Sequence, residues 1–209
     1  MPWQNRSKKR IVLGVTGSFG SGKTTVARIL GSYGAKLIDA DNIAHRVINP
    51  GTKAYKKIVD LFGRGIIQKD SKVDRKKLAR AVFNNKNLLK RLNSIVHPQV
   101  IRIINKRIKK TAVGIVILDA PLLLEAGLKG IVDKLIVVKT NREKQIKRIR
   151  AKTSLSRQDI LKRIRCQIPL RAKARLADFV IDNSGKITET KKKLERIRRL
   201  LWKSWISEI

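Results

Sequence analysis

The segment GVTGSFGSGKTT, Gly14 to Thr25, limits the fold of this chain more narrowly than any other part of the sequence. Within it, Gly17 to Thr24 satisfies the pattern G-x-x-x-x-G-K-[ST], which forms a phosphate-binding P-loop when a buried strand precedes it and a helix follows. Ile11–Thr16 is an apolar run that predicts the strand, and helically spaced apolar residues after the glycines predict the helix. This context favours a P-loop over an ordinary glycine-rich turn.

The P-loop residues are expected to bind a nucleoside triphosphate. Glycines let the backbone curl so that successive N–H groups converge on a β-phosphate, and the following helix N-terminus adds a favourable dipole. Lys23 should reach the β and γ phosphates, and the Thr24 hydroxyl should bind Mg²⁺. ATP and Mg²⁺ are therefore the expected cofactors. The candidate nucleotide-binding residues here are Gly20, Ser21, Gly22, Lys23, Thr24 and Thr25.

Two aspartates, Asp39 and Asp41, lie at the end of the second predicted strand, Lys36–Asp39. Because alternate residues of a strand point the same way, Asp39 and Asp41 would converge if the extended backbone continued that far. One could then accept a hydroxyl proton while the other supports water on Mg²⁺. The alternative is that both cap a helix beginning near Asn42.

A third aspartate, Asp119, ends the predicted strand Gly114–Leu118. This is the position from which an aspartate contacts Mg²⁺ in P-loop proteins. Ala120 and Pro121 follow, so the glutamate that many hydrolytic P-loop motors place there is missing, which favours a kinase over an ATPase. Glu125 could contribute to the site or could cap a turn, and we favour the turn cap.

Strands and helices alternate along the chain. Leu135–Val138 and Phe179–Asp182 predict further buried strands, and such alternation predicts an α/β fold with a parallel sheet covered by helices on both faces. The ligand of such a sheet lies beyond the carboxyl ends of its strands. A long helical pattern, Lys86–Lys110, is expected to break or bend at Pro98. The neighbouring His97 fits a helix-break residue or a ligand contact equally well.

Residues 142–175 form a basic helical insert between two predicted strands. Asn141 and Ser156 are predicted N-caps of its first two helices. The insert has the position and character of the lid of small P-loop kinases, whose arginines close over the transferring phosphates. A solvated helical face with surplus charge is the alternative.

The composition is strongly basic, with 50 Lys and Arg against 15 Asp and Glu and a formal net charge of +35. Such an excess attracts polyanions, although biased codon usage could also leave it on solvated surfaces. Cys166 is the only cysteine, which excludes an intrachain disulfide and a cysteine metal cluster. No segment approaches the length of a membrane helix. We therefore expect a cytoplasmic protein with no membrane partner, and we infer no obligate protein partner.

Taken in order, the motifs of the chain resemble the dephospho-coenzyme A kinase family over about residues 11–185. The resemblance implies transfer of the ATP γ-phosphoryl group to the ribose 3′-hydroxyl of dephospho-CoA, which gives CoA and ADP in the last step of coenzyme A biosynthesis. The motifs are TGSFGSGKTT, IDAD at 38–41, NPG at 49–51, LNSIVHP at 92–98, LDAPLLLEAG at 118–127, QIKR at 145–148 and ADFVIDNSG at 177–185.

The resemblance also implies roles for individual residues. Asp41 would be the base, Arg148 would belong to the lid, and the segment Asn183–Gly185 would lie near the adenine of ATP. With Lys23, the first two form the candidate catalytic set. Asp39 and His97 are candidate contacts of the acceptor substrate.

The implied architecture is the three-layer P-loop NTPase fold with a five-stranded parallel sheet. We expect a single kinase domain over 1–209. Its core would comprise 11–50, 111–141 and 176–209, with a helical acceptor-binding region at 51–110 and the lid at 142–175.

Two other functions fit the charge of the chain. One is a P-loop kinase that acts on another nucleotide or on a nucleic acid end, and the other is a basic nucleic-acid-binding protein that retains a P-loop. The sequence lacks the stacking-aromatic cluster of RNA-recognition modules and the spacing of zinc fingers.

The net charge predicts loose, salt-sensitive adhesion to nucleic acid. In a filter-binding titration with an oligonucleotide, the association constant should fall steeply as salt rises, because binding releases counterions. An association constant that does not change between about 50 and 200 mM salt would contradict this prediction.

Overall fold

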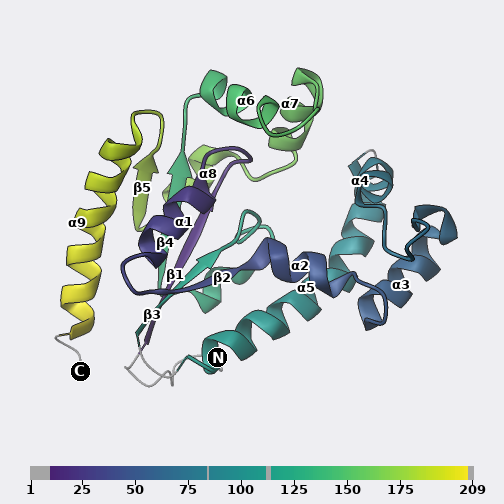
Figure 1. The fold of residues 1–209 in the computed structure, drawn as a ribbon, viewed down its shortest axis with the longest axis horizontal. Coiled ribbons are helices and arrows are strands. Elements are labelled where there is room, and N and C mark those ends of the chain that lie inside the picture. Colours follow the sequence, from purple (N-terminus) through teal and green to yellow (C-terminus); the bar gives the residue numbers. More distant parts are fainter. Residues whose placement is uncertain (1–9, 84, 112–113, 207–209) are drawn as a thin grey trace. The chain divides into compact units, whose positions relative to one another are not determined.

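The computed structural model describes residues 10–83, 85–111 and 114–206 (Figure 1). Two compact units make up the chain. One comprises Met1–Asp39 and Arg107–Ile209, and the other comprises Ala40–Lys106. Within the described ranges, no helix is both long enough and apolar enough to cross a membrane.

The first unit contains a five-stranded sheet in the order β2-β3-β1-β4-β5. Every neighbouring pair of strands is parallel, which confirms the predicted parallel α/β fold (Figure 1). The strands are β1 (Arg10–Gly17), β2 (Lys36–Asp39), β3 (Gly114–Asp119), β4 (Lys134–Lys139) and β5 (Phe179–Asp182).

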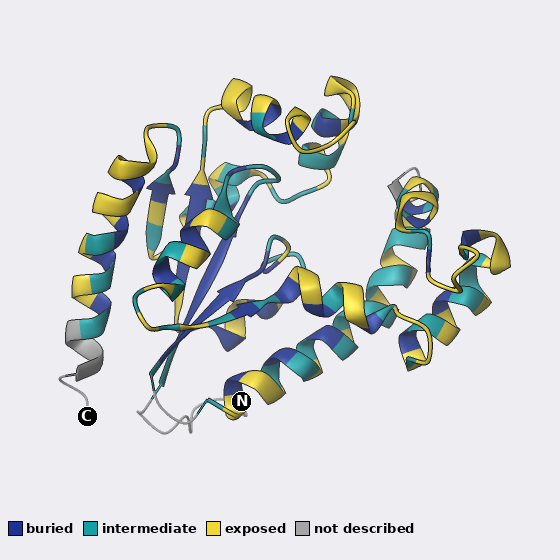
Figure 2. Ribbon diagram, viewed as in Figure 1, coloured by how far each residue is buried: buried dark blue, intermediate teal, exposed yellow. Residues whose placement is uncertain are grey.

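Side chains that alternate along the strands form the core of this unit. Leu13 and Val15 of β1 pack with Ile136 of β4 in one buried cluster, and residues of α1 (Lys23–Gly31) and α9 (Ile187–Ile206) join it. Figure 2 shows the central strands buried and the outward-facing turns of α9 exposed. Burial on both faces of the strands explains their nearly continuous apolar sequences.

The basic insert folds into three short helices, α6 (Arg142–Arg150), α7 (Arg157–Arg165) and α8 (Leu170–Arg175). Asn141 caps α6 by accepting a hydrogen bond from the Glu143 N–H at 2.9 Å. Ser156 caps α7 in the same way, through the Asp159 N–H at 3.1 Å. Both predicted N-caps are confirmed.

The second unit is helical. It contains α2 (Ala40–Val47), α3 (Lys53–Phe62), a 3-10 turn η1 (Arg64–Ile66), α4 (Arg75–Phe83) and most of α5 (Lys86–Lys109). Its core is a separate apolar cluster of Ile58, Ile66, Val73, Leu78 and Val82. This unit therefore has a hydrophobic core of its own.

The expectation that Asp39 and Asp41 converge as alternate residues of one strand is wrong. β2 ends at Asp39, and α2 begins at the next residue. Ala40, Ile43 and Val47 are buried along one side of α2, and this helical spacing explains the early start.

Of the break or bend predicted at Pro98, the break is wrong, because α5 continues through this residue. Val100 and Ile104, which follow it, are buried. Their packing keeps the chain helical although the proline lacks an N–H for the helical ladder.

Candidate active site

The carboxyl ends of three neighbouring strands carry the candidate polar residues of the first unit. β1 leads directly into the P-loop, while β2 and β3 end in Asp39 and Asp119. The parallel register pairs Asp39 with Asp119, and Val15 of β1 pairs with Asp119 from the other side. The sheet therefore places Asp119 next to the strand that leads into the P-loop, and Asp39 one strand further away.

The P-loop has the backbone conformation that its glycines permit. Gly20 and Gly22 have φ values of 78° and 88°, a left-handed region that L side chains rarely adopt. Gly17 meets a different constraint, because a Cβ there would lie 2.4 Å from the Val138 carbonyl oxygen. Within the loop, the Ser21 N–H donates to the Ser18 carbonyl at 3.0 Å.

Asp119 is 3% exposed and accepts a side-chain hydrogen bond from Thr24. Burial raises the pKa of its carboxyl group, and the charge of Asp39 adds to this effect while Lys23 and the Thr24 hydrogen bond oppose it. Its Oδ1 is buried and has no hydrogen-bond partner among the described residues. A buried carboxylate oxygen without a partner is costly unless a cation satisfies it.

These features fit Mg²⁺. The ion is commonly held by one or two protein groups together with phosphate oxygens and water, so a cluster of several acidic or histidine ligands is not required. The described residues contain no such cluster of three or more. The Asp119 Oδ1 and the Thr24 hydroxyl are oxygen donors of the kind that Mg²⁺ prefers.

Asn183 is buried and ties the start of α9 to the P-loop. Its Nδ2 donates to the Ser21 carbonyl at 2.9 Å, and its Oδ1 accepts from the Thr190 hydroxyl at 3.0 Å. A Cβ on Gly22 would lie 2.2 Å from this Nδ2. The amide therefore supports the loop backbone. Gly185, two residues later, packs so closely that a Cβ there would lie 1.9 Å from Glu189 Oε2.

Arg148, on α6, lies beside the same loop. Its Nη2 donates to the Asn183 carbonyl at 3.0 Å, and its Nη1 donates to the Thr140 hydroxyl at 3.4 Å. Nη1 is also 3.5 Å from the position that a Cβ on Gly22 would occupy. The basic insert thus brings a guanidinium group next to the phosphate-binding loop.

Comparison with known proteins agrees with this geometry. Residues 11–189 match the dephospho-CoA kinase family. The chain belongs to that family. It is 46% identical to the dephospho-CoA kinase of Carboxydothermus hydrogenoformans over 93% of this chain and 96% of the relative, and 43% identical to that of Oceanobacillus iheyensis over 90% and 96%.

Solved structures show the same fold. A crystal structure from Thermus thermophilus has a TM-score of 0.79 at 32% identity and covers 92% of this chain and 98% of its own. The dephospho-CoA kinase of Campylobacter jejuni has a TM-score of 0.68 at 30% identity, with coverages of 93% and 98%. A shikimate kinase from Acinetobacter baumannii, with a TM-score of 0.51 at 14% identity and 94% coverage of both chains, shares the P-loop kinase fold.

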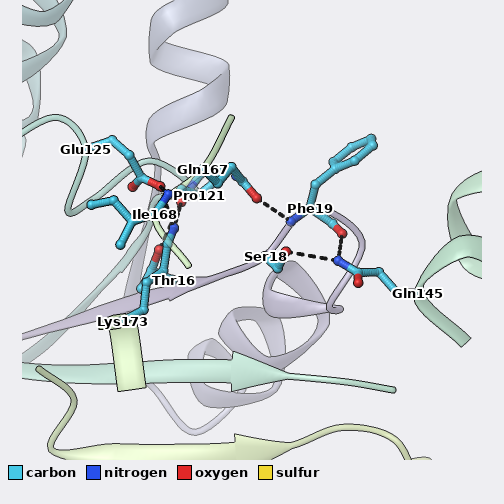
Figure 3. Close-up of polar contacts among 9 residues, drawn as sticks. All are labelled: Thr16, Ser18, Phe19, Pro121, Glu125, Gln145, Gln167, Ile168 and Lys173. Carbon is cyan, nitrogen blue, oxygen red and sulfur yellow. Dashed lines mark hydrogen bonds and ion pairs between the residues drawn. The ribbon is translucent and has the colours of Figure 1, made fainter. Parts of the chain in front are cut away.

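Two glutamines form hydrogen bonds with Ser18 and Phe19 of the P-loop in this member of the dephospho-CoA kinase family (Figure 3). Gln145 on α6 donates to the Ser18 hydroxyl at 3.0 Å and to the Phe19 carbonyl. Gln167, after α7, accepts from the Phe19 N–H at 2.8 Å. Our sequence analysis missed both roles. For Gln145 a signal existed, since Gln145 and Arg148 are three residues apart and so lie on one face of a helix.

The interpretation of Glu125 as a turn cap is wrong, because it forms an ion pair with the fully buried Lys173 at 2.8 Å (Figure 3). The same Oε1 accepts from the Ile168 N–H at 3.0 Å. The Lys173 ammonium also donates to the Pro121 carbonyl at 3.2 Å, and the Thr16 hydroxyl donates to that carbonyl at 3.0 Å. The pair therefore joins α8 to the segment after Asp119.

The two remaining predicted residues belong to the second unit. Asp41 is exposed in the first turn of α2. His97 is half-buried in α5, and burial lowers the pKa of its imidazole, which favours the neutral ring. A neutral imidazole can both donate and accept a hydrogen bond.

Breaking the Glu125–Lys173 pair should destabilise the protein strongly. Lys173→Met leaves the Glu125 carboxylate poorly compensated, and we expect a loss of about 3 to 5 kcal/mol in the free energy of unfolding, measured by denaturant titration. The double variant Lys173→Met/Glu125→Gln should recover much of this loss, because it removes both charges. A single variant within about 1 kcal/mol of wild type would show that the pair is dispensable.

Proposed function

We propose that this chain transfers the γ-phosphoryl group of ATP to the ribose 3′-hydroxyl of dephospho-CoA, giving CoA and ADP. The supporting observation is a structured P-loop beside the buried Asp119 in a chain that belongs to the dephospho-CoA kinase family. The comparisons give no support to a nucleic acid end or another nucleotide as the acceptor.

In the proposed reaction, the P-loop binds the phosphates of the donor. Phosphoryl transfer passes through a loose transition state with charge spread over the equatorial oxygens, so positioning and electrostatic stabilisation dominate. The backbone N–H groups of the loop and the Lys23 ammonium would supply fixed positive charge. Arg148, held beside Gly22, would add a guanidinium group that can form two parallel hydrogen bonds to phosphate.

Thr24 and Asp119 would hold Mg²⁺, which when bound supplies positive charge to the β and γ phosphates. Burial raises the pKa of Asp119, while Lys23 and the Thr24 hydrogen bond favour its ionised form. Asp39, paired in register with Asp119, would strengthen the negative field that attracts the cation. We therefore regard Asp39 as a support for the metal site as well as a candidate substrate contact.

Asp41 is the proposed base. It would take the proton of the 3′-hydroxyl while the hydroxyl oxygen forms a bond to the γ-phosphorus, and the bond from that phosphorus to the β–γ bridging oxygen breaks to release ADP. Asp41 is exposed in the first turn of α2. The segment Asn183–Gly185 and His97 remain proposed contacts of adenine and of the acceptor.

The proposal is tested directly by mixing the protein with MgATP and dephospho-CoA and following CoA and ADP. AMP, adenosine and an oligonucleotide serve as alternative acceptors. Dephospho-CoA should have the highest kcat/KM, and a preference for the oligonucleotide would instead support a nucleic-acid kinase. A cytoplasmic location and loose polyanion adhesion stay predictions, testable by cell fractionation and by binding over a salt series.

Asp41→Asn should lower kcat by about 100-fold or more, because general-base catalysis contributes roughly that factor. The dissociation constant for ATP should change by less than threefold, since the base acts on the acceptor. Asp60→Asn, an exposed carboxylate on α3 of the same unit, is the matched control and should leave kcat unchanged. Turnover of the Asp41 variant within a few-fold of wild type would exclude this role.

A further inference from the structure

Phe19, the third residue of the P-loop motif, has a large apolar side chain at a position that the motif leaves open. The pattern G-x-x-x-x-G-K-[ST] sets no requirement there. The Phe19 ring packs against a small apolar cluster of the basic insert, whose buried members are Ile146, Ile149 and Ile160. The P-loop therefore contributes this ring to the hydrophobic core that α6 and α7 share.

The main chain of Phe19 is bonded to the basic insert from two sides (Figure 3). The Gln145 side-chain amide of α6 donates to the Phe19 carbonyl, and the Phe19 N–H donates to Gln167 Oε1 at 2.8 Å. Gln145 also donates to the neighbouring Ser18 hydroxyl at 3.0 Å. Because these bonds involve the backbone of Phe19, they tie the path of the loop to the position of the insert.

Two further contacts surround the same point of the loop. The Arg163 guanidinium of α7 lies 5.9 Å from the centroid of the Phe19 ring, within the range of a cation–π interaction. At the next residue, a Cβ on Gly20 would lie 2.5 Å from Ile149 Cγ1. Helix α6 therefore packs directly on the loop backbone, and glycine at position 20 permits this approach.

The apolar cluster that receives Phe19 is separate from the core of the sheet. Ile146, Ile149 and Ile160 form one buried cluster, and the side chains of β1, β4, α1 and α9 form another. Helices that have a small core of their own can shift against a sheet more readily than helices that share its core. The contacts at Phe19 oppose such a shift, because it would return an apolar ring to water.

Arg148 is carried by the same helix as these contacts. Gln145, Arg148 and Ile149 lie three and four residues apart, so one face of α6 presents the loop contacts and the guanidinium group together. The Arg148 Nη1 is 3.5 Å from the position that a Cβ on Gly22 would occupy. A shift of α6 relative to Phe19 would therefore move Arg148 away from the phosphate-binding backbone.

We propose that Phe19 is a positioning residue, which docks the basic insert on the P-loop and thereby places Arg148 beside the donor phosphates. The inference rests on the proposed function, in which Arg148 stabilises the charge on the transferring phosphoryl group. The Phe19 N–H is bonded to Gln167, so Phe19 acts through α6 and not on the phosphates themselves. A small misplacement of a charged group is sufficient to lower the rate of a reaction that depends on positioning.

The kinetic test is a double-mutant cycle of Phe19→Ala and Arg148→Ala. Arg148→Ala should lower kcat about 100-fold, as for the loss of one electrostatic contact to a transition state. Phe19→Ala should lower it about tenfold through misplacement of that contact. Because both changes remove the same interaction, the double variant should be no slower than Arg148→Ala alone, whereas independent effects would multiply to about 1000-fold. The KM for dephospho-CoA should change by less than about twofold, because the lost interaction belongs to the transition state.

Two further variants separate positioning from a loss of stability. Phe19→Leu keeps an apolar side chain and should retain kcat within about threefold of wild type. Phe179→Ala is the matched control, because its partly buried ring packs in the core of the sheet at the start of β5, away from the carboxyl ends of the strands. It should lower the melting temperature and leave kcat unchanged.

Hydrogen exchange supplies a readout that requires no acceptor. In Phe19→Ala, the amide hydrogens of α6 and α7 should exchange at least about threefold faster than in wild type, because the undocked helices open more often. The amide hydrogens of α1 should exchange at the wild-type rate. Phe179→Ala should leave exchange in α6 and α7 unchanged.

Two results would overturn the proposal. Equal exchange of α6 and α7 in Phe19→Ala and wild type would show that the ring does not dock the insert. Multiplied effects in the double variant would show that Phe19 does not act through Arg148. Failure of wild type to phosphorylate dephospho-CoA would reject the proposed function and with it the role through Arg148, and the exchange measurement distinguishes this case from a failure of docking.

Discussion

The structure depends on holding a short stretch of backbone in a conformation that it would not keep alone. The N–H groups of the P-loop must converge, which requires left-handed glycines at Gly20 and Gly22. Glycines alone would leave the loop flexible, because glycine has more conformational freedom to lose on folding than any other residue. The restraint comes from outside the motif, since Asn183 holds the Ser21 carbonyl and two glutamines hold Phe19. Such preorganisation is what makes fixed dipoles effective against developing charge.

Two acidic residues near the loop differ in how their negative charge is compensated. Asp119 and Glu125 each have one buried oxygen without a hydrogen-bond partner among the described residues, but Glu125 also forms an ion pair with Lys173 that compensates its charge. The charge of Glu125 is therefore compensated within the fold, whereas a bound cation would compensate that of Asp119. This difference is consistent with the role of a metal ligand proposed for Asp119 and with a structural ion pair at Glu125.

Local patterns in the sequence predicted much of the fold, because strands, N-caps and the P-loop are specified by residues close together in the chain. The strand ends at Asp39 and Asp119 and the caps Asn141 and Ser156 follow from such patterns. The errors have a physical cause too. Helix α5 continues through Pro98 because packing on either side outweighs one lost hydrogen bond, and Lys173 pairs with a residue far away in the sequence, which no local pattern encodes. Gln167 was missed for the same reason.

The large positive charge is best understood residue by residue. Lys173 is buried and neutralised, and Arg148 is fixed by carbonyl and hydroxyl oxygens, so neither is available for loose attraction of polyanions. Arg75 and Lys76 differ from both, because they are exposed, form no ion pair with the described residues and occupy a helix end where positive charge is unfavourable. Net charge determines how strongly any anion is attracted, whereas cations held in fixed positions determine which anion is bound specifically. Attraction and recognition can therefore be separated experimentally even in so basic a chain, since attraction weakens with the loss of any surface cation and recognition only with the loss of a particular few.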